Sequence, residues 1–128
     1  MKYLFTISIL FIFVSISFSQ NKVEGVYKII DIDTLSEHYI INAINEKDSV
    51  RVVVISFKDD VDCTNKILIE KNKVYYLSLQ NYLEIINVTP SMLAGGFTLK
   101  FGDKVIWDKS KNFYPYKALN IKGIFLCE

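Results

Sequence analysis

Apolar residues follow one another in short runs along most of this chain, and polar residues separate the runs. From residue 23 onward the runs are rich in Val, Ile, Tyr and Phe, with Asn, Asp, Lys and Gly between them. This pattern is typical of β-strands joined by turns. We expect strands at 26–32, 38–44, 50–57, 74–80, 97–101, 104–108 and 124–127, the last as an edge strand, and a brief apolar segment at 67–69.

The first three runs predict an antiparallel meander. Run 50–57 is an almost unbroken series of β-branched residues, so we expect a central strand that is covered on both faces. In run 74–80, Tyr75, Leu77 and Leu79 alternate with other residues. Because successive side chains of a strand point to opposite faces, this alternation predicts one face on the core.

Residues 82–88 are expected to continue the preceding strand with a bend. The next segment predicts the one helical turn of the chain. Thr89 is a candidate N-cap, Pro90 occupies the first helical position, and Gly95 follows the end.

Gly102 and Asp103 predict a hairpin between runs 97–101 and 104–108. A two-residue loop with Gly first fits a type II′ turn. In that register Leu99 faces Ile106 on the core side, and Trp107 lies on the opposite face.

These elements predict an all-β protein of about seven short strands with one short helical turn. The expected fold is a small antiparallel barrel (OB-like) or a sandwich, and residues 20–128 are expected to form a single β-rich domain. The chain resembles small uncharacterised exported bacterial proteins with an OB-like barrel in the order of its segments. These are the meander, a charged connection, the strand KNKVYYLSL, the late hairpin and a closing NIKGI segment. The resemblance covers most of residues 24–126 and implies a fold but no activity. An OB barrel has five strands, so the extra segments are decoration or the fold is a sandwich.

Residues 1–19 predict a cleaved signal peptide. Lys2 supplies a positive start, an apolar run extends over residues 4–18, and Ser17 and Ser19 place small residues before a cut at Gln20. No Cys, which could carry a lipid, ends the apolar run. We therefore expect an exported product, periplasmic or secreted, with no stable membrane anchor after cleavage.

Removal of residues 1–19 takes away one basic residue, Lys2, and leaves 15 − 1 = 14 basic residues, which balance the 14 acidic ones. The 15 basic residues of the whole chain include one arginine, Arg51. A protein surface that binds nucleic acid needs a basic groove. We therefore expect no nucleic-acid partner.

The chain holds two cysteines, Cys63 and Cys127. An even pair in an exported protein predicts one disulfide. It would close a loop of about 65 residues, worth about 4 kcal/mol in the chain-entropy model. The alternative is a reactive Cys63 thiol, although the neighbouring aspartates would raise its pKa.

Catalysis by a nucleophile needs a base within reach. With a single histidine in the chain, the candidate is a Cys63/His38 dyad oriented by Asp60 or Asp62. The aspartates of residues 59–62, with Asp31 or Asp33, could instead bind Ca²⁺. They lack the spacing of an EF-hand, so a solvated acidic loop is the simpler interpretation. We expect no metal and no cofactor.

Aromatic residues are the remaining candidates for binding. We select Trp107, Phe113, Tyr114 and Tyr116, since the rings around Pro115 cannot all point inward from a loop. Exposed aromatic patches often mark contact surfaces, and the alternative is a plug over one end of the barrel. The expected function is a non-enzymatic binding or interaction module with a protein or small-molecule partner, and an inhibitor or immunity-type protein is a specific form of it. The alternative is a small exported thiol enzyme that uses Cys63 and His38.

Overall fold

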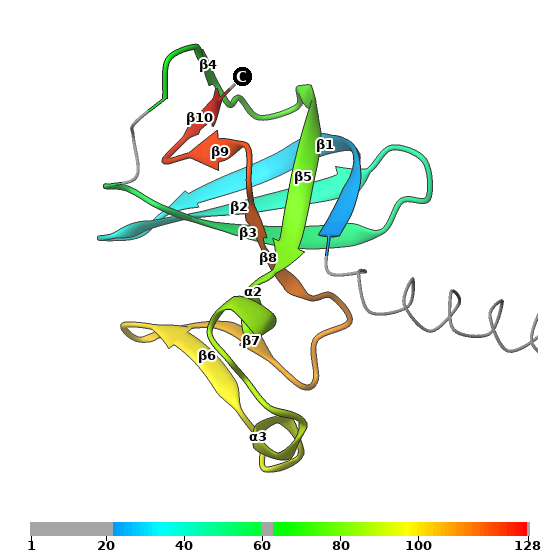
Figure 1. The fold of residues 1–128 in the computed structure, drawn as a ribbon, viewed down its shortest axis with the longest axis vertical. Helices are drawn as coiled ribbons and strands as arrows, with labels where there is room; N and C mark the ends of the chain where they lie inside the picture. Colours follow the sequence, from blue (N-terminus) through cyan, green and yellow to red (C-terminus); the bar gives the residue numbers. More distant parts are fainter. Residues whose placement is uncertain (1–21, 60–62, 128) are drawn as a thin grey trace, which may run out of the picture.

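Five β-strands close into a barrel in the computed structural model, which describes residues 22–59 and 63–127 (Figure 1). Their order around the barrel is β1-β2-β3-β8-β5. The bounds are β1 Lys22–Thr34, β2 His38–Asn45, β3 Arg51–Phe57, β5 Val74–Asn81 and β8 Pro115–Ala118. The fold is all-β and a barrel rather than a sandwich, and it is compatible with an OB-like barrel. The predicted signal peptide lies outside the described residues.

The barrel strands arise from the apolar runs of the sequence. β1, β2 and β3 pair as the predicted antiparallel meander. β3 is buried on both faces from Val52 to Ser56, which confirms the interpretation of its β-branched run. β5 buries Tyr75, Leu77 and Leu79 and exposes the residues between them or leaves them half-buried, as the alternation predicts.

β8 closes the barrel. It pairs in parallel with β3 and antiparallel with β5. Inside, Ile29, Ile41, Val54, Leu77 and Leu79 are fully buried in one cluster. Burial of each such side chain stabilises the fold by about 1.5–3 kcal/mol relative to its exposure to water.

A small sheet of order β4-β10-β9 packs onto this core through Ile121 and Leu126. Its strands are β4 Lys66–Leu68, β9 Ile121–Lys122 and β10 Phe125–Cys127. β10 lies in the middle, so the predicted edge strand at 124–127 is wrong in this respect. The sequence alone does not show that the short 66–68 run pairs with it.

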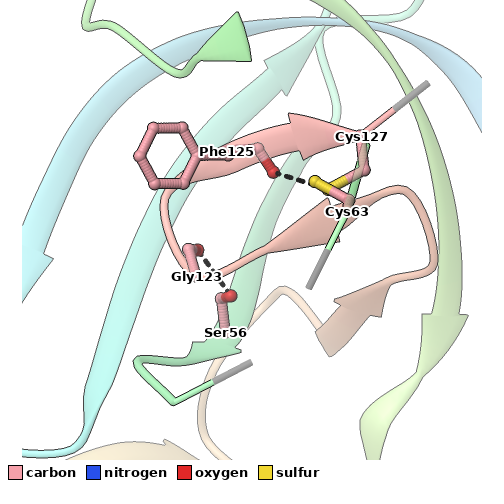
Figure 2. The surroundings of a disulfide bond; sticks show 5 residues. All are labelled: Ser56, Cys63, Gly123, Phe125 and Cys127. Carbon is pink, nitrogen blue, oxygen red and sulfur yellow. Dashed lines mark hydrogen bonds between the residues drawn. A yellow bond between two sulfur atoms is a disulfide. The ribbon is translucent and has the colours of Figure 1, made fainter. Parts of the chain in front are cut away.

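The Cys63–Cys127 disulfide anchors this sheet and confirms the predicted pairing (Figure 2). The two Cα atoms lie 5.8 Å apart. Beside it, the buried Ser56 hydroxyl of β3 donates a hydrogen bond to the Gly123 carbonyl at 2.6 Å. The C-terminal sheet is therefore tied both to the chain after β3 and to β3 itself.

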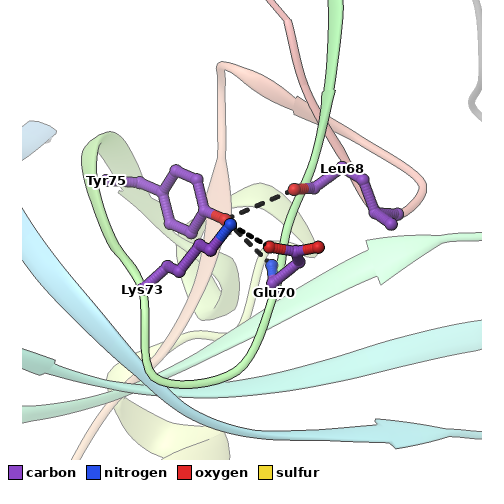
Figure 3. Close-up of polar contacts among 4 residues, drawn as sticks. All are labelled: Leu68, Glu70, Lys73 and Tyr75. Carbon is purple, nitrogen blue, oxygen red and sulfur yellow. Dashed lines mark hydrogen bonds and ion pairs between the residues drawn. The ribbon is translucent and has the colours of Figure 1, made fainter.

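Tyr75 fixes the connection between β4 and β5 (Figure 3). Its hydroxyl donates to the Leu68 carbonyl at 3.3 Å and accepts from the Glu70 amide at 2.9 Å. Lys73 forms an ion pair with Glu70 across the same turn, and this contact raises the pKa of Lys73.

The connection between β5 and β8 forms a second layer. It contains α2 Tyr82–Ile85, α3 Pro90–Ala94, β6 Thr98–Phe101 and β7 Lys104–Asp108. Ile40, Val53 and Ile55 belong to β2 and β3 but point away from the barrel interior, because their neighbours Ile41 and Val54 fill it. They form a separate core with residues of the connection, among them Leu83, Leu99, Ile106 and Trp107. The connection therefore covers the outer face of β2 and β3.

Two local predictions in this connection have different outcomes. Residues 82–85 form helix α2, so the predicted bent strand is wrong. The Asn81 side chain accepts the Leu83 amide at 2.9 Å and caps the helix, a role that Asn favours. The predicted turn at α3 is confirmed, with Thr89 Oγ1 accepting the Met92 amide and Pro90 at the first position.

The predicted hairpin is present, but its register changes part of the way along. Gly102 has φ +61, as the first position of a type II′ turn requires. A bulge between Leu99 and Lys100 pairs Leu99 with Trp107 instead of Ile106. Because a bulge re-aims the following side chains, Ile106 and Trp107 are both buried, and the predicted placement of Trp107 on the other face is wrong.

Pro115 lies in a β-strand and not in the loop that the sequence predicts. It is fully buried as the first residue of β8, facing Val53 of β3. Proline is tolerated at the first position of a strand because the ladder there does not need its missing N–H. The segment around Pro115 is therefore part of the barrel and not a free loop.

Candidate functional site

A groove lies between the outer face of β2 and β3 and the chain of β7 with the segment after it. Its volume is about 220 Å³. The buried side chains of Ile40, Val53 and Ile106 form its apolar floor. The remaining lining residues are Asp33, Asn42, Arg51, Lys104, Val105, Lys111 and Phe113. We call this hollow the Arg51 groove.

Arg51, the first residue of β3, is held from two sides. Its guanidinium carbon lies 5.0 Å from the ring centroid of Phe113, in a cation–π contact. Its Nη2 donates to Asn42 Oδ1 at 3.0 Å. A guanidinium has five N–H donors, and the bond to Asn42 uses one of them, so among the described residues most have no acceptor.

The two lysines of the groove differ in their partners. Lys104 Nζ contacts Asp33 Oδ2 at 2.5 Å, an exposed pair that joins the hairpin to β1. Within the described residues Lys111 forms no ion pair. The Ser110 hydroxyl and amide donate to the Asp108 carboxylate and lower its pKa, and the charge of Lys111 lowers it further. Asp33 therefore offsets the charge of Lys104, and Asp108 partly offsets that of Lys111, so the guanidinium of Arg51 is the main cation of the groove.

A second hollow of about 340 Å³ adjoins the groove. Its lining shares Arg51 and Asn42 with the groove and adds Ile30, Asp31, Ala43 and Ile44. The guanidinium of Arg51 thus lies where two hollows meet on the outer side of the barrel.

Aromatic residues support one wall of the Arg51 groove. The Trp107 indole is buried, and its Nε1 donates to the Phe113 carbonyl at 2.6 Å. This bond holds Phe113 in place under Arg51. Tyr114, 54% exposed, stacks against Trp107 with the ring centroids 6.2 Å apart.

The predicted aromatic patch is thus only partly brought together. Trp107, Phe113 and Tyr114 lie next to one another beside the groove. Tyr116 is half-buried and packs against the barrel core, and burial raises its pKa, with smaller contributions from Tyr27 and neighbouring groups. Of the four predicted binding residues, Tyr114 alone presents a largely exposed ring.

The predicted catalytic pair has other contacts. Cys63 is bonded to Cys127, so its sulfur is not a thiolate in this structure. His38 stacks on Phe101 at 3.9 Å between ring centroids and also contacts Phe57 at 4.7 Å. Asp60 and Asp62 lie outside the described residues. Within the part of the chain that is described, no group of three or more His, Cys, Asp or Glu residues could hold a metal ion.

Arg51, Asn42, Lys104 and Lys111 line the groove but were not selected from the sequence. The one available signal was that Arg51, the sole arginine, begins the central strand. The sequence does not reveal that the connection after β5 folds back over this strand, which is what creates the groove.

In comparisons with known proteins, no family model matches the chain, and no significant match was found among curated proteins or solved structures. None of the helices in the described ranges has the length and apolar character that a membrane span requires.

Proposed function

We propose that this protein is an exported, non-enzymatic binding module that holds its partner in the Arg51 groove. The observation that carries the proposal is the oriented guanidinium of Arg51 above a floor of buried aliphatic side chains. Binding sites commonly combine an apolar surface with a few fixed polar groups. An inhibitor or immunity-type protein is a specific form of this function.

The groove offers cations, an amide and a ring, and its one carboxylate is already paired with Lys104. These groups are suited to recognition. Nucleophilic catalysis would need a nucleophile with an adjacent base, and Cys63 is engaged in the disulfide. The OB-like order of the barrel strands is compatible with this proposal, since such barrels often serve as binding scaffolds.

Export is supported by the signal-like sequence of residues 1–19 and by the disulfide, because disulfides persist in oxidising compartments. The intact mass of the protein recovered outside the cytoplasm should lack residues 1–19, with cleavage before Gln20. Recovery of a chain that begins at Met1 in the membrane fraction would contradict export.

Site-specific crosslinking tests the binding surface. Tyr114 lies beside the groove, and Tyr76, with a similar exposure of 53%, lies on the outer face of β5 as a matched control. A photoreactive phenylalanine at position 114 should form a discrete adduct in the envelope fraction or medium of the producing cells, and excess unlabelled protein should suppress it. The same group at position 76 should form none. Equal adducts at both positions, or none at 114, would contradict the proposal.

A further inference from the structure

We infer that the Arg51 groove recognises an acidic segment of a protein partner, with a carboxylate held by the guanidinium of Arg51. This inference rests on the proposed function and adds the chemical class of the ligand. It is carried by the way Arg51 is positioned and by the balance of charge around it.

Arg51 is oriented but has no acidic partner among the described residues. Lys73 pairs with Glu70, and Lys104 pairs with Asp33. The contacts of Arg51 are the Phe113 ring and the neutral Asn42 amide. A fixed guanidinium with free N–H donors matches the planar fork of a carboxylate, and two parallel hydrogen bonds then form with little loss of side-chain entropy.

The surrounding charges favour an anion in the groove. Lys111 adds a second cation without an ion pair, and the charge of Lys104 is offset by Asp33. Asp31 is the acidic residue that lines the neighbouring hollow. An anion at Arg51 therefore also meets the positive charge of Lys111, which the nearby Asp108 carboxylate offsets only in part.

The apolar floor of the groove favours a peptide over a simple ion. Ile40, Val53 and Ile106 offer aliphatic surface directly beside the cations. An acidic segment with alternating apolar side chains would place apolar groups on the floor and carboxylates on Arg51. A nucleic acid fits less well, because the chain carries 14 acidic residues against 15 basic ones and has no broad positive field.

Two side-chain resonances make the test specific. The chain has one arginine and one tryptophan: Arg51 lines the groove, and Trp107 is bonded to Phe113 in its wall. In a ¹⁵N-labelled, oxidised sample, the Arg51 Nε–H and Trp107 Nε1–H signals each report from a single known position. The probes are a capped peptide of alternating Glu and Leu, the same peptide with Gln in place of Glu, and inorganic phosphate.

The Glu–Leu peptide should shift both signals in a saturable way, and the Gln–Leu peptide should bind at least about tenfold more weakly. Arg51→Gln should weaken the binding of the Glu–Leu peptide about tenfold or more. The affinity of this variant is measured from the shift of the Trp107 signal. Arg51→Lys should recover only part of the loss, because an ammonium lacks the fork. Lys28→Gln removes an exposed charge from β1 outside the groove and should leave the affinity unchanged.

Several results would overturn the inference. Equal binding of the two peptides, full recovery by Arg51→Lys, or an equal loss in Lys28→Gln would each exclude a carboxylate fork at Arg51. Inorganic phosphate that displaces the peptide at equal concentration would make the groove a general anion site. Equal binding of both peptides with a shift of Trp107 would still leave the groove a binding surface, so the two proposals fail separately.

Discussion

At the scale of single residues, the structure separates two tyrosines that the sequence treats alike. Tyr114 is largely exposed, whereas Tyr116 packs against the barrel core. Tyr114→Ala should change the free energy of unfolding by no more than about 0.5 kcal/mol. Tyr116→Ala should lower it by about 2 kcal/mol, since core contacts are lost. Urea unfolding of both variants checks this, and equal losses would mean that the aromatic segment acts as a single plug.

The burial of Tyr82 should make the free energy of unfolding fall in alkali. Tyr82 is 6% exposed, and burial raises the pKa of its phenol above the usual value of 10.0. The folded state therefore favours the neutral phenol, so its contribution is fully present below pH 10.0 and is lost as the pH rises through the folded pKa. Tyr82→Phe should flatten the fall in unfolding free energy above pH 10.0, measured by urea unfolding across this range. An unchanged slope would show that other groups cause the loss.

The residues of the candidate site differ in how clearly the sequence marks them. Phe113 and Tyr114 are predictable because the rings around Pro115 cannot all point inward from a loop, and both lie at or beside the groove. Arg51 could not be selected, because its role depends on Phe113, which is far away in sequence. Tyr116 packs against the barrel core because Pro115 begins a barrel strand, which the sequence does not show.

At the scale of elements, the hairpin of β6 and β7 is joined to the barrel by a few side chains. Phe101 stacks on His38 of β2, and Lys104 pairs with Asp33 of β1. Phe101→Ala should loosen the hairpin by about 1–2 kcal/mol, because the ring stack contributes more than an exposed ion pair.

Amide hydrogen exchange checks this prediction. The amides of β6 and β7 should exchange faster in Phe101→Ala, and those of β2 and β5 should be unchanged. Val105→Ala is the control, since Val105 is on the same hairpin, 41% exposed and without a ring partner. Equal exchange in the two variants would show that the buried residues of the hairpin, Leu99, Ile106 and Trp107, hold it without the ring stack.

Elements with a strong local pattern were predictable, and those set by single side chains or by distant pairing were not. The meander and β5 follow from runs of β-branched residues and from strict alternation. Helix α2 depends on the Asn81 cap, which outweighs the strand propensity of residues 82–86. The hairpin turn was read correctly from Gly102, but the bulge at Leu99 has no local signal, because packing against β2 and β3 determines it.

At the scale of the whole molecule, the disulfide restrains the chain where regular structure is shortest. The strands of the C-terminal sheet have three, two and three residues, and Cys127 lies in the central one. Cys63 and Cys127 are 64 positions apart, so the bond greatly reduces the freedom of the unfolded chain. In the chain-entropy model this contributes about 4 kcal/mol.

The double variant Cys63→Ser/Cys127→Ser should therefore unfold at a markedly lower urea concentration, with a loss of up to about 4 kcal/mol in the free energy of unfolding. The wild-type protein in reductant should show the same shift, which separates the missing bond from the effect of the serines. Thiol labelling without reductant should modify neither cysteine. An unchanged unfolding midpoint, or labelling of both thiols in the untreated protein, would show that the barrel and its C-terminal sheet hold together without the bond.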